Sequence, residues 1–166
     1  MELSELDIAT FRRVVGRFAT GVVVLTTRTD EGLHGLTANA FCSVSLDPLL
    51  VLVCVDKLAR GHDRVERAQA FAISILSDRQ EFLADRFAGR APLVNARFDG
   101  APFHEAVTGA PILQGSAAWL DCRLWATYDG GDHSIFVGQA VGADEDPSMR
   151  SLVFQDSRFV RLGGQL

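Results

Sequence analysis

The sequence predicts a mainly β protein, an antiparallel barrel with a few added helices, and three observations support this fold class. Apolar, β-branched segments recur along the chain, and most are separated by short turns that contain Gly, Asp or Ser. Helical periodicity is confined to the start and the middle of the chain. Strands do not alternate regularly with long helices, so the parallel, doubly wound sheet of βαβ proteins is not expected.

The composition is that of a globular protein. The 166 residues are close to the length of one average domain, and we expect a single domain over residues 1–166. Hydrophobic residues make up 48% and charged residues 22%, which excludes a disordered chain. The net charge of −5 argues against nucleic acid or an acidic membrane surface as a partner, because both are bound by clustered Lys and Arg. We expect a small-molecule ligand instead.

The cysteines and the N-terminus predict a cellular compartment. Cys42, Cys54 and Cys122 are odd in number, lie far apart and form no C-x-x-C pair, so we interpret them as reduced, packed thiols. Residues 1–7 lack the basic and apolar regions of a signal peptide, and no segment of about 18 apolar residues is present. The sequence therefore predicts a soluble cytoplasmic protein.

An amphipathic helix is predicted at the start of the chain. Apolar residues recur there at steps of three and four, with arginines between them: Ile8, Phe11, Val14, Val15 and Phe18. Asp7 or Ser4 is expected to cap the start of this helix, and Gly21 is expected to stop it before the first strand.

Two apolar segments frame a polar one in the first third of the chain. Residues 20–27 are predicted to form a strand, which turns at residues 29–32 into the polar stretch 33–48 and so makes a hairpin. Residues 49–55 are apolar at every position. After Pro48 we therefore expect a central strand that is covered on both faces.

Two further helices are predicted in the middle of the chain. Residues 56–63 are rich in charge and contain Gly, which predicts a loop that opens a short helix through Arg67. Ser77 and Gln80 have the spacing of a capping box, which predicts a helix from there to about Phe87.

The remaining strands are predicted at residues 71–76, 117–128, 133–143, 152–154 and 158–162. The two longest are joined by a strong turn signal at 129–132, and the last two by a turn at 156–157. Asp121 and Arg123 fall on the face opposite to the apolar residues of their strand. Residues 88–115 contain many Gly and Pro and are expected to be mostly irregular.

Several sharp catalytic motifs are absent from the sequence. It contains no G-x-G-x-x-G, G-x-x-x-x-G-K-[ST], G-x-S-x-G or H-E-x-x-H. Rossmann dehydrogenases, P-loop NTPases, α/β-hydrolases and zincins are therefore disfavoured. The four histidines stand apart from other metal ligands, so no metal site is expected.

Three segments are candidates for a ligand site, and each also has an ordinary structural interpretation. Residues 37–40 combine small side chains with Thr and Asn groups that can meet a planar ring, but they also suit a polar turn. Residues 57–62 place cations and small residues at a helix entrance, where a phosphate could bind, or form a solvated loop. His133 follows a tight turn and can reach into a cleft, or is a polar turn residue.

Two motifs make these segments interdependent. One is the Thr-x-Asn-x-Phe-x-Ser-Val-Ser sequence that begins at Thr37, and the other is Gly131-Asp132-His133. Their order and spacing resemble the short-chain flavin reductase family, and the resemblance covers nearly the whole chain. It implies the FMN-binding split β-barrel, which is antiparallel and Greek-key-like.

The resemblance also implies a homodimer with each flavin near the subunit interface. The flavin ring is expected against residues 37–40 and 54–56, and its phosphate at residues 57–62. His133 is expected beside the ring where the nicotinamide stacks, as the catalytic residue. The cofactor-binding residues implied by the family are Thr37, Ala38, Asn39, Ala40, Cys54, Val55, Asp56, Lys57, Ala59, Arg60, Gly61, His62 and Phe159.

The phosphate segment departs from the family pattern. Many relatives have Ser and Thr where this chain has Ala59 and Gly61, so two hydroxyl donors are missing. Phosphate binding is therefore expected to depend on backbone amides and on Lys57 and Arg60.

The activity implied by the resemblance is an NAD(P)H-dependent flavin reductase. Such an enzyme transfers a hydride from NADH or NADPH to FMN or FAD and supplies the reduced flavin to a partner monooxygenase. Two alternatives stay open: a flavoprotein that keeps FMN tightly bound and acts on its own substrate, and a flavin-binding module without turnover. The first predicts a yellow purified protein, and the second predicts flavin binding without NADH oxidation.

Overall fold

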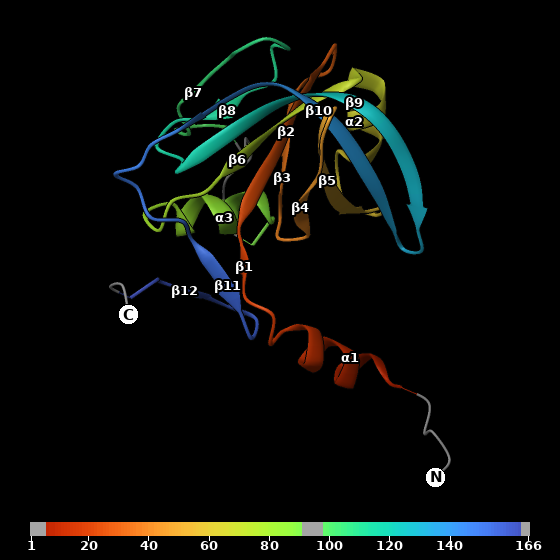
Figure 1. Cartoon of the computed structure of the whole chain (residues 1–166), viewed down its shortest axis with the longest axis vertical. Coiled ribbons are helices and arrows are strands. Elements are labelled where there is room, and N and C mark those ends of the chain that lie inside the picture. Colours follow the sequence, from red (N-terminus) through yellow and green to blue (C-terminus); the bar gives the residue numbers. More distant parts are fainter. Residues whose placement is uncertain (1–5, 91–97, 164–166) are drawn as a thin grey trace.

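A computed structural model describes residues 6–90 and 98–163 of the chain, and its main element is a seven-stranded sheet (Figure 1). The strand order is β3-β2-β6-β9-β10-β5-β4, and every neighbouring pair is antiparallel. The strands are β2 (Val23–Thr29), β3 (Gly32–Ala38), β4 (Phe41–Leu46), β5 (Leu49–Asp56), β6 (Ala70–Ile75), β9 (Ala118–Gly130) and β10 (His133–Glu145). The mainly β class predicted from the sequence is confirmed.

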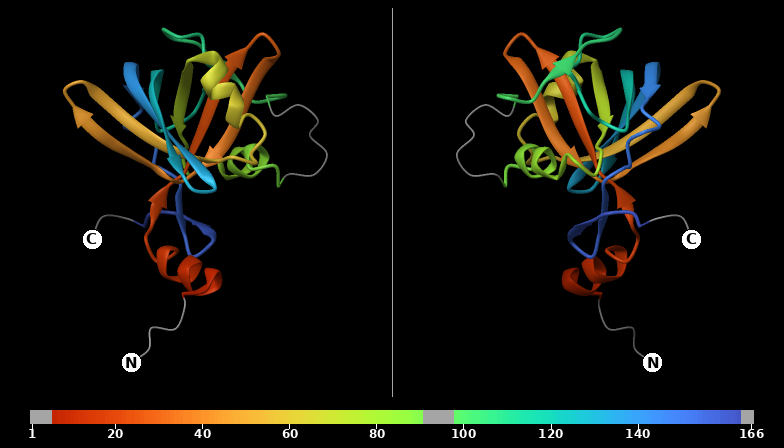
Figure 2. Two further views of the ribbon diagram at one scale, coloured as in Figure 1. Left: turned by 90° about the vertical axis from the view of Figure 1, so that its right-hand side faces the viewer. Right: turned by 90° about the vertical axis from the view of Figure 1, so that its left-hand side faces the viewer.

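The remaining elements are short and surround this sheet. The helices are α1 (Ile8–Val15), α2 (His62–Ala68) and α3 (Glu81–Phe87). A small sheet joins β1 (Thr20–Gly21), β11 (Val153–Gln155) and β12 (Arg158–Val160), and another joins β7 (Phe103–His104) and β8 (Ile112–Leu113). Figure 2 shows α1 and the first small sheet below the large sheet, away from its core.

The large sheet curves around one apolar core (Figure 2). All seven strands and α2 contribute side chains to it, and its largest fully buried members include Leu25, Phe71 and Phe136. A second cluster lies between β2, α3 and the loops beside them, and it contains Val24 and Phe87. The sheet is therefore the framework on which the loops and strand ends are held.

One predicted strand environment is wrong. Residues 49–55 were expected to be central and covered on both faces, but β5 lies next to the edge strand β4. Val51, Val53 and Val55 are buried, whereas the residues between them are only half-buried. Among the described strands, β2 is covered on both faces because its successive residues enter the first and the second core in turn, and β6 is also buried on both faces.

The first helix is present, but it is shorter than predicted. The Asp7 carboxylate accepts a hydrogen bond from the Thr10 amide at 2.8 Å, as expected for its cap, while the alternative cap Ser4 lies outside the described residues. The helix ends at Gly16 and not at Gly21, since the Gly16 amide already donates to the Arg12 carbonyl at 2.9 Å.

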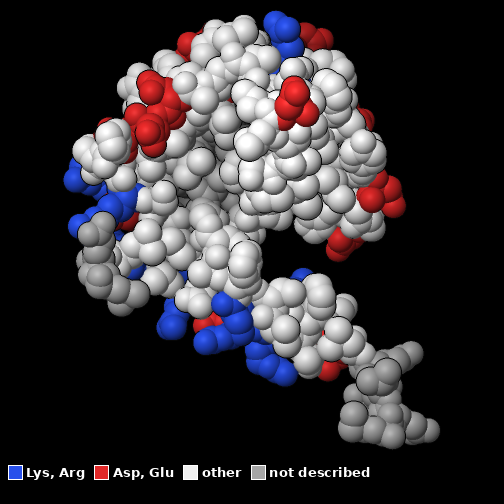
Figure 3. Space-filling model, in the orientation of Figure 1, with Lys and Arg blue, Asp and Glu red and all other residues white. Residues whose placement is uncertain are grey.

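The apolar face of α1 is not covered by the described part of the chain. Ile8 and Phe11 are 72% and 52% exposed, and Phe18, which follows the helix, is 77% exposed. Arg12 and Arg13 occupy its last turn, and Figure 3 shows basic side chains gathered around α1 and the small sheet beside it. A helix with one apolar and one basic face therefore stands away from the large sheet.

The predicted capping box is only half formed. The Gln80 side chain accepts from the Ser77 amide at 3.0 Å, but the Ser77 hydroxyl has no hydrogen-bond partner among the described residues. Helix α3 begins at Glu81, about one turn later than predicted. The predicted hairpins at 29–32 and 129–132 are confirmed as the β2–β3 and β9–β10 connections.

Two polar or reactive residues differ from their predicted environments. Asp121 is completely buried, because its carboxylate accepts from the Val107 and Thr108 amides at 2.7 and 2.8 Å and so anchors a loop. Cys42 is exposed and not packed, whereas Cys122 is buried, and the described cysteines are free. No helix in the described ranges is long and apolar enough to span a membrane.

Candidate functional site

A cavity of about 280 Å³ opens where β3, β5, α3 and the start of β10 meet. These elements are far apart in sequence, and the curvature of the sheet brings their ends together (Figure 1). The residues that line the cavity are Leu36, Thr37, Ala38, Asn39, Ala40, Cys54, Val55, Asp56, Ala59, Arg60, Phe87, Ala88 and His133. Most of the predicted site residues therefore share one cavity.

Small side chains form much of the cavity wall. Ala38 and Ala40 flank the link between β3 and β4, and the Ala40 carbonyl accepts from the Cys54 amide at 2.9 Å. This bond ties the link to β5, so the two parts of the wall are held together. Side chains of this size let a flat ring approach the backbone closely.

Thr37 and Asn39 are held by the protein itself. The Thr37 hydroxyl donates to the Ala84 carbonyl of α3 at 2.6 Å, and the Asn39 amide nitrogen donates to the Thr20 hydroxyl at 3.2 Å. A hydroxyl has one hydrogen to donate, so Thr37 presents only an acceptor to the cavity. Asn39 keeps a second amide hydrogen and its carbonyl oxygen.

The charged end of the cavity is formed by the loop after β5. Arg60 is exposed, and among the described lining residues it is the only Lys or Arg. Asp56 shapes this loop, since its carboxylate accepts from the Leu58 amide at 2.8 Å and its carbonyl accepts from the Ala59 amide at 2.9 Å. In the described part of the cavity lining, Arg60 is therefore the one Lys or Arg available to a negatively charged group.

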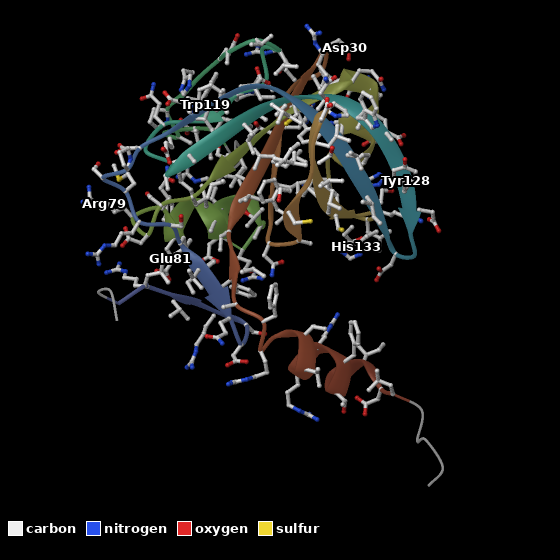
Figure 4. All side chains as sticks on the ribbon, viewed as in Figure 1. Asp30, Arg79, Glu81, Trp119, Tyr128 and His133 are labelled. Atoms are coloured by element: carbon white, nitrogen blue, oxygen red, sulfur yellow. The ribbon has the colours of Figure 1, made fainter. Side chains whose placement is uncertain are left out.

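His133 enters the cavity from the first position of β10, directly opposite Asp56 on β5. Figure 4 shows it beside the β9–β10 turn, near Tyr128. Its Nδ1 lies 2.7 Å from the Asp132 carboxylate. A carboxylate only accepts, so Nδ1 carries the hydrogen, and Nε2 is the acceptor of the neutral ring. This hydrogen bond, followed by the positive charge that the ring carries only when it is protonated, lowers the pKa of Asp132.

Burial affects one thiol in the wall. Cys54 is half-buried, and desolvation, followed by the nearby Cys42 thiol, raises its pKa above the ordinary value. The thiol form is therefore favoured, and Cys54 acts as a small apolar side chain in the wall.

Four predicted site residues do not line this cavity. The Lys57 ammonium reaches the β9–β10 turn, and Gly61 turns the chain into α2 with a φ of 102°. The His62 Nε2 lies 2.7 Å from the Ser134 hydroxyl, and its ring contacts Phe136. Phe159 lines a separate cavity of about 100 Å³, which also borders residues 37–39.

Three lining residues were not among the predicted site residues. Phe87 and Ala88 come from the end of α3, and Leu36 precedes the polar wall in β3. The end of α3 could be predicted from the sequence, but its distance from residues 37–40 could not. A local signal existed in Gly35, because a side chain there would collide with Phe87.

The fold and the cavity together define a class of protein. Small side chains, a single arginine and a histidine form a site that suits a planar, negatively charged organic molecule. The described residues contain no group of three or more potential metal ligands. The lining of the cavity is that of a binding protein or an enzyme that handles an organic cofactor or substrate.

Comparison with known sequences agrees with this class. The profile of the flavin reductase like domain matches residues 15–163. The NADH-dependent FAD reductase of Streptomyces globisporus is 42% identical over 93% of this chain and 86% of its own length. The FMN reductase (NADH) SmoA of Agrobacterium fabrum is 41% identical, with 93% and 86% covered. The flavin-dependent monooxygenase reductase subunit HsaB of Mycobacterium tuberculosis is 33% identical, with 89% and 77% covered.

Solved structures give the same result. The NADH:FAD oxidoreductase SgcE6 of Streptomyces globisporus has a TM-score of 0.89 at 39% identity, with 98% of both chains covered. BorF, the flavin reductase component of a bacterial two-component tryptophan halogenase, has a TM-score of 0.87 at 39% identity, covering 96% of this chain and 100% of its own. This chain belongs to the flavin reductase like domain family, so the resemblance seen in its motifs is confirmed.

Proposed function

We propose that this protein is an NADH-dependent flavin reductase that transfers a hydride from the nicotinamide to FMN or FAD. The observation that carries the proposal is the meeting of His133, Arg60 and the small-residue wall at 38–40 in one cavity. The chain shares about 40% identity with reductases named for NADH and for FAD or FMN. NADPH as the donor is a testable alternative.

The residues of the cavity fit a flavin by their chemistry. The wall of Ala38, Ala40 and Cys54 suits the flat ring, and Arg60 suits a phosphate group. When bound, the flavin supplies the hydride-accepting ring, so the protein needs no nucleophile. The backbone at 38–40 orients this ring, and we assign these contacts to Thr37, Ala38, Asn39, Ala40, Cys54, Val55, Asp56, Ala59 and Arg60.

His133 is proposed to orient the nicotinamide. The Asp132 carboxylate fixes its Nδ1–H, so Nε2 can accept a hydrogen bond from the carboxamide of the donor. Correct placement of two rings converts a bimolecular encounter into an oriented one, which accounts for a large part of the acceleration. We therefore expect His133 to act on NADH more than on flavin.

Steady-state oxidation of NADH, followed at 340 nm with FMN or FAD added, tests the activity. The expected result is flavin-dependent turnover, with kcat/KM for NADH lowered about 10- to 100-fold by His133→Asn while the flavin KM changes little. Absence of turnover with both flavins and with both NADH and NADPH would refute the reductase assignment. A yellow protein that reduces added flavin slowly would support a retained FMN.

We further infer that the protein is a homodimer. The apolar face of α1 is exposed, and a largely apolar groove of about 490 Å³ runs from α1 to β4 and β5. Phe18, Phe41 and Leu52 line this groove, and Cys54 borders both the groove and the flavin cavity. A second copy seated here would bury these side chains and close one side of the flavin site.

The biological setting is proposed from the same relatives. Reductases of this family include named components of two-component systems, so reduced flavin is proposed to pass to a partner monooxygenase. We propose that the whole chain is one flavin reductase-like domain with the split-barrel form of its sheet, which is consistent with a profile match over residues 15–163. Free thiols at the described cysteines agree with a cytoplasmic location.

A further inference from the structure

Lys57 has partners that its position in the sequence did not predict. It follows β5 at the start of the segment expected to bind the flavin phosphate, but its side chain does not line the cavity. The ammonium group donates to the Asp129 carboxylate and, at 2.6 Å, to the Gly131 carbonyl. The Lys57 amide donates to the Asp132 carbonyl at 3.0 Å. One residue therefore contacts three positions of the β9–β10 turn.

This turn carries the proposed nicotinamide-binding residue. Gly131 adopts a φ of 82°, which L side chains rarely adopt, and the chain then enters β10 at His133. Asp129, Gly131 and Asp132 are exposed, so burial contributes little to the position of the turn. The contacts from Lys57 link the turn to β5, the strand that forms the facing part of the cavity wall.

The opposite charges of Lys57 and Asp129 support a structural role for their contact. The hydrogen bond from Lys57, followed by its positive charge, lowers the pKa of Asp129. The Lys57 and Asp129 side chains are 40% and 80% exposed. An exposed ion pair of this kind shifts the equilibrium between a held and a displaced β9–β10 turn by about fivefold at most. The hydrogen bond to the Gly131 carbonyl adds to this preference for the held turn.

Arg60 provides the contrast. It lies three residues after Lys57 in the same loop, and it is the cation that lines the cavity. The two positive charges of this loop are therefore directed to different places.

We propose that Lys57 is a positioning residue, which holds the β9–β10 turn so that His133 faces the nicotinamide, and that recognition of the flavin phosphate is left to Arg60. The proposal rests on the proposed function. It assigns to one loop two separable tasks, one for each substrate of the reaction.

The test compares four variants of the full-length protein with FMN and with riboflavin, which lacks the phosphate. Lys57→Met removes the ammonium, Asp129→Asn weakens the same contact from the other side, and Arg60→Gln is the matched cation control. The fourth variant combines Lys57→Met with Asp129→Asn. Circular dichroism and thermal unfolding establish that each variant is folded.

We expect Lys57→Met, which loses both contacts, to lower kcat/KM for NADH about three- to tenfold. Asp129→Asn, which loses only the ion pair, should lower it about two- to fivefold, and the double variant should be no worse than Lys57→Met. The preference for FMN over riboflavin should be unchanged in these variants and should be reduced in Arg60→Gln. General attraction of the anionic donor would instead make Lys57→Met and Asp129→Asn act in opposite directions.

Effects in opposite directions would overturn the proposal, and so would any of three further results. The first is loss of the FMN preference in Lys57→Met with Asp129→Asn unaffected, which would make Lys57 a phosphate ligand. The second is full additivity of the two single effects, and the third is kinetics unchanged in both. If the wild-type protein has no flavin-dependent activity, the proposed function fails, and the ring signals of His133 in NMR spectra then test the positioning alone. They should shift in Lys57→Met and Asp129→Asn but not in Arg60→Gln, and unshifted signals would overturn the proposal.

Discussion

A single methyl group added at Gly35 should displace the Phe87 ring, which forms part of the cavity wall. Gly35 lies in β3, and a Cβ built there would be 2.7 Å from Cε1 and 2.8 Å from Cδ1 of Phe87. Phe87 is 1% exposed and lines the cavity, and its ring also meets Phe98 at a centroid distance of 5.1 Å. The ring must therefore move, and the open cavity lies beside it.

Two opposing contributions set the change that Gly35→Ala makes in the free energy of unfolding. Overfilling a packed site costs about 1–3 kcal/mol. Replacing Gly by Ala also restricts the unfolded chain, which stabilises the folded state by about 0.4–1 kcal/mol. For a chain of this length, about 1 kcal/mol corresponds to about 2–4 °C in Tm. We expect Gly35→Ala to lower the Tm and to raise the KM for FMN, because the displaced ring narrows the cavity.

Gly21→Ala is the matched control, since a Cβ at Gly21 would have no atom within 4 Å. Its Tm should equal or exceed that of the wild type, so the difference between the two variants isolates the collision. Adding Phe87→Leu to Gly35→Ala should recover part of the loss, because it removes the ring atoms in contact. If Gly35→Ala matches Gly21→Ala in both Tm and KM, the close approach described here is wrong.

Three further predictions concern other parts of the molecule. Burial, followed by the charge of Arg64, lowers the pKa of His34 below its usual 6.5. Below about pH 6.5 the unfolded chain takes up a proton at His34 that the folded chain does not, so the free energy of unfolding should fall as the pH drops. Urea unfolding at pH 7.5 and 5.5 measures this fall, and His34→Gln should make it smaller. Burial, followed by the Asp121 charge, raises the pKa of Cys122 to about 12. A maleimide at pH 8 should therefore modify this thiol only after the protein unfolds. Rapid modification of the native protein would contradict the burial of Cys122. Phe18→Glu places a charge in the apolar groove that runs from α1 to β4 and β5, and it should shift the mass in light scattering toward a monomer. A monomeric wild type would refute the proposed dimer.

The positions of turns and strands could be predicted from the sequence more accurately than the burial of each strand and side chain. Turns at 29–32 and 129–132 were predictable because Gly and Asp favour tight connections through local geometry alone. The covering of a strand depends on its neighbours in space, so residues 49–55 could not be distinguished from the doubly covered β2. Asp121 likewise looked solvent-facing, since its loop partners lie more than ten residues away.

The candidate site also contains residues whose positions the sequence predicted and others whose positions it did not. Motif spacing placed residues 37–40, Cys54 and His133 together, and they do line one cavity. The direction of a long side chain is set by contacts that the sequence does not display, and Lys57 therefore looked like a phosphate ligand in a loop that Arg60 shares. Phe87 was missed because its proximity to β3 depends on how α3 packs.

The cavity wall is assembled from positions 38, 54, 88 and 133, which are spread over most of the chain. Contacts between such distant positions require long loops to close, which costs conformational entropy. A partly folded chain that has only its local hairpins lacks the cavity that we propose to bind flavin. Ligand binding at the completed site would therefore select fully folded molecules, adding about 2.7 kcal/mol of stability at a flavin concentration of one hundred times Kd. The supply of flavin in the cell would then influence how much of this protein persists.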